Sequence, residues 1–183
     1  MTDGPSTDGP ARRSERPDVF VADEQSDVAV DSKQLGRLAA AVLVDHGVRA
    51  HSELALYFVD AVVMADLNER YMGETGATDV LAFPIDEDTE PGRSPDAGTP
   101  GPDRGPVDAS EIPLLLGDVF VCPVVAQRNA IERSVPVDDE FALLVVHGVL
   151  HVLGMDHGDA DEAAAMQARE RDLLARFHHR SPT

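Results

Sequence analysis

Residues 147–157 read H-G-V-L-H-V-L-G-M-D-H, and this stretch restricts what the rest of the chain can be. Its first two histidines, His147 and His151, lie four residues apart inside an apolar run, so a helix would project both imidazoles from one face. Gly154 can adopt the positive φ that ends a helix. The chain could then fold back and bring His157 to the same point, which would place three nitrogen ligands around one centre.

Three histidines leave a tetrahedral zinc ion with one open position, as in catalytic rather than structural zinc sites. A single histidine on an apolar helix would more often be a satisfied core residue, but three at these offsets favour a metal site. We therefore predict one Zn²⁺ per chain, held by His147, His151 and His157. Nickel and copper are compatible with the same ligand type.

Metalloproteases with the pattern H-E-x-x-H-x-x-G-x-x-H share this spacing and use the glutamate beside the first histidine as a general base. Here that position is Gly148. The stretch therefore predicts the metal scaffold without the peptidase chemistry. A zinc ion lowers the pKa of its bound water from the value in bulk water to about 7, so hydroxide can form without a neighbouring glutamate.

Three blocks of the sequence resemble the YbeY family of metal-dependent endoribonucleases, also called rRNA maturation factors. Residues 147–157 are similar to the family pattern H-G-x-L-H-(L)-x-G-x-D-H. Residues 67–68 (L-N) and 78–84 (T-D-V-L-A-F-P) are similar to L-N-x-x-[YW]-R…T-D-V-L-S-F-P, and residues 116–123 (L-G-D-V-F-V-C-P) to L-G-D-I-x-I-C. The blocks fall in family order and span most of the chain between about residues 50 and 160.

The resemblance implies a zinc-dependent, single-strand-specific endoribonuclease that hydrolyses phosphodiester bonds. It implies a role in ribosomal RNA maturation, including processing of the 3′ end of 16S rRNA, and in ribosome quality control. The implied partners are ribosomal RNA and the small ribosomal subunit, with an assembly GTPase and a small-subunit ribosomal protein as further candidates. Two alternatives stay open: a ribosome-assembly factor with a mainly structural metal, and a metal hydrolase of another substrate.

One position departs from the family pattern. The family commonly has an arginine after the aromatic residue of the second block, and Met72 stands there, whose thioether cannot hold a phosphate. Arg70 or another cation takes this role, or the metal acts alone. Asp156, next to His157, could orient a ligand, accept a proton, or cap the turn. The candidate catalytic residues are therefore His147, Asp156 and Arg70.

The charge of the chain weighs against a general nucleic-acid binder. Its net charge is −19 at pH 7, whereas phosphate recognition normally requires a basic surface. However, 16 of the 34 acidic residues lie in residues 1–31 and 86–111. Five arginines in segments expected to fold could form a local basic strip beside the metal: Arg128, Arg133, Arg169, Arg171 and Arg176.

We expect a single domain over residues 18–178, preceded by a disordered tail (1–17) and interrupted by a mobile acidic insertion (86–111) rich in Gly and Pro. The predicted fold is α+β, with a mixed sheet of about four strands near residues 19, 54, 80 and 116, about five helices, and the metal helix at the centre. The family resemblance implies a zincin-like arrangement. The single cysteine and the absence of an apolar N-terminal segment predict a cytoplasmic protein without a membrane span.

Overall fold

A four-stranded mixed sheet forms the centre of the computed structural model, which describes residues 16–85, 113–156 and 158–178. The strands are β1 (Asp18–Asp23), β2 (Ser52–Phe58), β3 (Val80–Pro84) and β4 (Leu114–Val121), in the order β1-β2-β4-β3. β1, β2 and β4 run parallel, and β3 pairs antiparallel with β4 at one edge. This agrees with the four strands and the mixed sheet predicted from the sequence.

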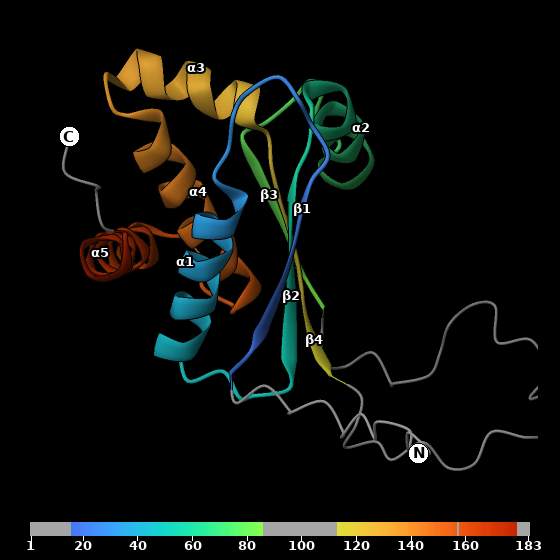
Figure 1. Ribbon diagram of the computed structural model, residues 1–183. Helices are drawn as coiled ribbons and strands as arrows, with labels where there is room; N and C mark the ends of the chain where they lie inside the picture. Colours follow the sequence, from blue (N-terminus) through green and yellow to red (C-terminus); the bar gives the residue numbers. More distant parts are fainter. Residues whose placement is uncertain (1–15, 86–112, 157, 179–183) are drawn as a thin grey trace, which may run out of the picture.

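Five helices lie in the described part of the chain: α1 (Ser32–Asp45), α2 (Ala61–Met72), α3 (Pro123–Arg133), α4 (Val137–Val152) and α5 (Ala160–Phe177). α1 and α4 cover one face of the sheet, and α5 packs on the outer side of these two helices (Figure 1). α2 lies on the opposite side of the sheet, and α3 lies near one end of the strands (Figure 1). The α+β class and the helices predicted from the sequence are confirmed.

The predicted domain limits are only partly within the described residues. Residues 86–111, predicted to be an insertion, lie outside them, and so does the segment predicted as an N-terminal tail apart from residues 16–17. The extent of the single domain therefore stays a prediction. Among the described residues, no helix has both the length and the apolar character needed to cross a bilayer.

Aspartate side chains determine where three of the helices begin. Asp31 accepts a hydrogen bond from the Gln34 amide, and Asp60 and Asp159 each accept two from the first turns of α2 and α5. Each such cap typically contributes about 1 kcal/mol, because it satisfies amides that have no partner within the helix. α4 begins instead after Pro136, with three acidic residues in its first turn, where the helix dipole favours negative charge.

α4 is the central helix of the fold, as predicted. It packs against β3 and β4 on one side and against α1, α3 and α5 on the others. Most of its circumference is therefore buried, and Val145, Val149 and Leu150 have no exposed surface. A helix enclosed in this way has little freedom to shift or rotate, so the side chains that it carries are held in fixed directions.

Gly148 brings α4 unusually close to the sheet. A Cβ at this position would lie 2.6 Å from Cγ1 of Val119 and 3.3 Å from Cγ2 of Val80. Val119 is completely buried in β4, so its stiff side chain has no space to move into. This contact explains in physical terms why the position occupied by glutamate in metalloproteases is a glycine in this chain.

We predict that Gly148→Ala lowers the free energy of unfolding by about 1–3 kcal/mol, because overpacking of the core outweighs the gain of up to about 1 kcal/mol in helix propensity. Urea unfolding measures this change. The double variant Gly148→Ala/Val119→Ala removes the contacting methyl groups and should be more stable than the sum of the single effects predicts. A Gly148→Ala variant as stable as the wild type would contradict the close approach.

Candidate functional site

A cavity of about 510 Å³ lies between β3, α4 and the turn that follows α4. Val80, Ala82 and Pro84 form its apolar wall on the side of β3. The polar groups in its wall come from His147, His151 and Asp156. The cavity therefore contains three of the site residues predicted from the sequence.

The two histidines of α4 point their Nε2 atoms toward the same point. These atoms are 3.1 Å apart, and the rings are inclined to one another by 81°. Two nitrogens bound at about 2.0–2.1 Å to one tetrahedral zinc ion would lie about 3.3 Å apart. The pair thus has a geometry suited to a shared metal ion, and the predicted projection of both imidazoles from one helix face is confirmed.

The third predicted ligand, His157, lies outside the described residues. Among the residues that are described, no group of three or more His, Cys, Asp or Glu side chains is arranged to hold a metal ion. The turn leading toward His157 is described: Gly154 has a φ of +85°, and its N–H donates to the carbonyl of His151. The predicted helix end at Gly154 is confirmed, and the role of His157 stays a prediction.

Glu170 of α5 contacts His147 at Nδ1, the ring nitrogen that does not face His151. Its Oε1 lies 2.7 Å from Nδ1 of His147, and only 7% of its surface is exposed. A carboxylate only accepts hydrogen bonds, so Nδ1 carries the shared proton and the Nε2 lone pair faces the cavity. Histidines that bind metals in proteins usually have a partner of this kind on the other ring nitrogen.

Sequence reasoning missed Glu170, although one signal could have revealed it. Met166, Glu170 and Leu173 lie on one side of α5, and all three are buried. A glutamate within the apolar stripe of a helix needs a partner, because burial of an unpaired charge is costly.

Ion pairs fix α5 against α1. Arg169 Nη2 lies 2.6 Å from Asp45 Oδ2, and Arg176 also pairs with this carboxylate. The hydrogen bond from Arg176, with a further one from Arg169, holds the pKa of Asp45 below its ordinary value despite some desolvation. These contacts keep the neighbouring Glu170 in place beside α4.

A second ion pair connects α3 to the first turn of α4. Arg133 Nη1 donates to both carboxylate oxygens of Glu140, at 2.9 and 3.2 Å, and Glu140 is 2% exposed. Burial raises the pKa of the Glu140 carboxyl, and the adjacent guanidinium partly offsets this. Three of the five arginines proposed for a basic strip are thus paired with carboxylates.

The sequence block formed by residues 67–68 and 78–84 provides structural contacts near the cavity. Asn68 Nδ2 donates to the carbonyl of Gly76 at 2.9 Å and so fixes the loop between α2 and β3. Asp79 accepts from the Val80 amide and from Asn129 Nδ2, each at 2.9 Å, which ties the start of β3 to α3. These bonds position β3, which forms one wall of the cavity.

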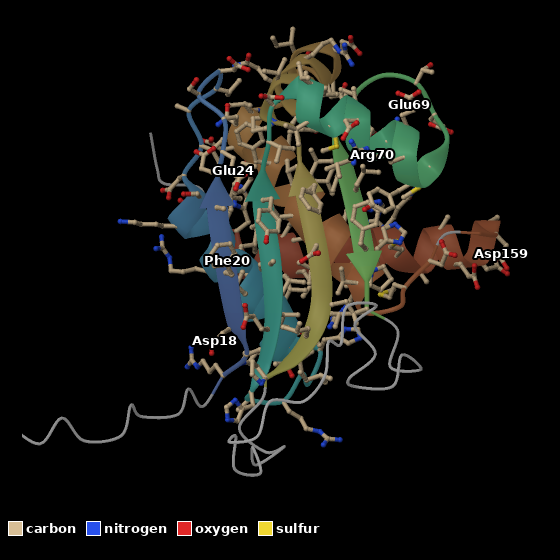
Figure 2. The ribbon with its side chains drawn as sticks, turned by 90° about the vertical axis from the view of Figure 1, so that its right-hand side faces the viewer. Asp18, Phe20, Glu24, Glu69, Arg70 and Asp159 are labelled. Carbon is tan, nitrogen blue, oxygen red and sulfur yellow. The ribbon has the colours of Figure 1, made fainter. Side chains whose placement is uncertain are left out.

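The structure does not bring Arg70 together with the two histidines. Its side chain is 68% exposed on α2, pairs with Asp66 at 3.0 Å, and does not line the cavity (Figure 2). Met72, where the family resemblance leads one to expect arginine, does line it. Within the described part of the chain, the cavity wall contains no lysine or arginine.

Comparisons with known proteins agree with this fold and these motifs. The family model of the endoribonuclease YbeY matches residues 20–178. An endoribonuclease YbeY from Beutenbergia cavernae is 41% identical over 153 residues, which are 84% of this chain and 93% of that protein. Another, from Mycolicibacterium vanbaalenii, is 40% identical over 150 residues, or 82% of this chain and 75% of that protein.

A solved structure shows the same fold. The solution structure of a protein from Thermotoga maritima matches with a TM-score of 0.52 and 20% sequence identity, over 87% of this chain and 91% of that one. Fold and sequence together place the chain in a class of endoribonucleases, hydrolases of RNA phosphodiester bonds. The chain belongs to the YbeY family.

Proposed function

We propose that this protein is a zinc-dependent, single-strand-specific endoribonuclease that acts in the maturation of ribosomal RNA. The observation that carries this proposal is the convergence of the His147 and His151 Nε2 atoms in the cavity of a YbeY family chain. Processing of the 3′ end of 16S rRNA, ribosome quality control, binding to the small subunit and a cytoplasmic location follow from the family resemblance. An assembly GTPase and a small-subunit ribosomal protein are partners proposed on the same ground.

His147 and His151 would hold the zinc ion through Nε2, with His157 as the proposed third ligand. A zinc ion with three histidine ligands supplies a bound water whose pKa is lowered to about 7 and a Lewis acid for a phosphoryl oxygen. Glu170 orients the His147 ring through Nδ1. Asp156, in the cavity wall, is placed to orient a ligand or to accept a proton.

A second candidate function, a ribosome-assembly factor with a structural metal, is favoured by one observation. The described wall of the cavity offers no arginine or lysine to a scissile phosphate. Such a cation stabilises the negative charge that develops on a phosphoryl group during transfer. The first experiment below, which measures zinc content together with RNA cleavage, distinguishes the two functions.

We predict that His147→Ala reduces the zinc content from about one ion per chain to near zero and lowers cleavage of single-stranded ribosomal RNA by at least about 100-fold, since a zinc ligand is lost. His46→Ala changes an exposed histidine directly after α1 and serves as the matched control, with zinc content and cleavage unchanged. Elemental analysis and a gel-based cleavage assay measure both quantities. Zinc bound by a wild type that cleaves no RNA would favour the assembly factor.

We predict that Glu170→Gln weakens zinc binding by about 10- to 100-fold, because the His147 ring loses its charged partner. Competition with a chromophoric chelator measures this affinity independently of RNA cleavage. Glu162→Gln neutralises an exposed carboxylate on the same helix and should leave the affinity unchanged. Equal affinities for wild type and a folded Glu170→Gln variant would refute the orienting role.

We predict that Met72→Arg raises kcat/KM for RNA cleavage by about 10-fold and makes it more dependent on salt, because a hydrogen bond from a charged group contributes about 1.5–3 kcal/mol. Met72→Leu keeps an apolar side chain of similar size in the cavity wall and should behave as the wild type. If Met72→Arg cleaves no faster than Met72→Leu, a cation at this position is not what limits the reaction.

A further inference from the structure

β3 lies at the edge of the sheet, and its free edge borders the cavity. It is the last strand in the order β1-β2-β4-β3, so within the described residues it pairs with β4 alone. The cavity wall contains Met72, from α2 on one side of the sheet, and His147 and His151, from α4 on the other side (Figure 1). The cavity therefore extends around the edge of β3, where unpaired backbone groups can bind another molecule.

The register of β3 against β4 shows which backbone groups point to the free edge. In an antiparallel pair, residues that exchange hydrogen bonds with the partner strand alternate with residues that do not. The Cys122 N–H donates to the Asp79 carbonyl at 2.8 Å, and the Ile85 N–H donates to the Leu116 carbonyl at 3.0 Å. Residues 79, 81, 83 and 85 therefore face β4. The backbone groups that point away from β4 belong to Val80, Ala82 and Pro84.

Ala82 provides the one available donor on this edge of β3. The Val80 N–H already donates to Asp79 Oδ1 at 2.9 Å, and Pro84 has no N–H. Within the described part of the chain, the backbone N–H and C=O of Ala82 have no hydrogen-bond partner. Ala82 also lines the cavity. One donor and a neighbouring acceptor are thus presented to whatever occupies the cavity.

This edge is poorly suited to a peptide strand. A strand that adds to a sheet forms hydrogen bonds at every second residue, and these bonds supply most of its affinity. Here the donor at Val80 is already used and the donor at Pro84 is absent, so a continuous ladder cannot form. The edge suits a compact ligand that needs a single donor and a single acceptor.

A nucleobase meets these requirements. Each of the four bases carries a donor beside an acceptor on its Watson–Crick edge, and unpaired bases in RNA are recognised through this edge. The apolar side chains of Met72, Val80 and Pro84 in the same wall can pack against a base. A phosphate fits less well, because the described wall contains no lysine or arginine. The volume of about 510 Å³ lies in the usual range for small-molecule sites, about 300–1,000 Å³.

We propose that the backbone of Ala82 binds the Watson–Crick edge of an unpaired RNA base next to the cleavage site. Its N–H donates to an acceptor of the base, and its C=O accepts from a donor of the base. Base pairing occupies the same edge, so this contact excludes nucleotides in a duplex and selects single strands. The proposal rests on the proposed nuclease function and names the part of the substrate that β3 recognises.

Amide hydrogen exchange of the zinc-bound protein, followed by NMR, tests the contact directly. The probe is a hexamer of 2′-O-methyluridine, which has no 2′-hydroxyl to take part in cleavage. In the free protein, the Ala82 amide should exchange at least about 10-fold faster than the Cys122 amide, which is bonded to Asp79. A saturating concentration of the hexamer should slow exchange at Ala82 by at least about 10-fold and leave Cys122 unchanged.

Two modified probes determine which part of the RNA is bound. A hexamer of N3-methyl-2′-O-methyluridine keeps the stacking surface but has no donor on the Watson–Crick edge. It should bind at least about 10-fold more weakly and should not protect the Ala82 amide. An abasic hexamer keeps the phosphates without the bases, and it should not protect this amide either.

A pair of variants tests the same contact through affinity. Ala82→Pro removes the N–H, and it should fold because Pro84 already occupies an equivalent position on the same edge. Ala82→Ser keeps the N–H and introduces the residue of the family pattern. Ala82→Ser should bind the uridine hexamer at least about 10-fold more tightly than Ala82→Pro, with equal zinc contents. If Ala82→Pro does not fold, the exchange measurements on the wild type still decide.

Four outcomes would overturn the proposal. Exchange at Ala82 as slow as at Cys122 in the free protein would show that the edge is already occupied. Equal protection by the abasic hexamer would identify a phosphate contact. Protection by an uncharged peptide of alternating threonine and serine would identify strand addition. RNA cleavage by a protein whose Ala82 amide the uridine hexamer does not protect would refute this contact and leave the nuclease function intact.

Failure of the nuclease function has a different signature. A zinc-bound wild type that cleaves no RNA, but whose Ala82 amide is protected by the uridine hexamer and not by its N3-methyl form, would refute the nuclease and support the base contact.

Discussion

The close approach of α4 to the sheet at Gly148 determines the geometry of the candidate site. Because this residue has no side chain, the helix lies directly against Val119 of β4 and Val80 of β3. His147, one position before Gly148, and His151, three positions after it, then face the cavity beside β3. A longer side chain at Gly148 would move the helix away from the sheet and shift both histidines together.

The site also depends on buried or partly buried carboxylates, each of which has a partner. Glu170 meets His147, Glu140 meets Arg133, and Asp45 meets two arginines of α5. Loss of one partner from such a pair is costly, because the remaining charge stays buried without compensation.

The elements of this fold could be predicted from local patterns, whereas their arrangement could not. The alternation of buried residues in β2 and the aspartate caps of α1 and α2 are properties of consecutive residues, so the sequence shows them directly. Strand order depends on pairing between distant segments, such as β2 with β4. The contact between Glu170 and His147 spans 23 residues and depends on how α5 crosses α4.

Arg70 illustrates why proximity in sequence is a poor guide to a site. Residues two positions apart on a helix point in directions about 200° apart, since each residue turns the helix by about 100°. Met72 faces the cavity, so Arg70 faces away from it and pairs with Asp66 one turn earlier. A substitute for the family arginine would need to come from another element.

The most direct test of the central claim is anomalous diffraction at the zinc edge from crystals of the protein grown with zinc. Our account predicts one anomalous peak per chain, about 2.0–2.1 Å from the Nε2 atoms of His147 and His151, with His157 as the third ligand and Glu170 on Nδ1 of His147. No peak between the two histidines, or a metal bound through Nδ1 of His147, would contradict it.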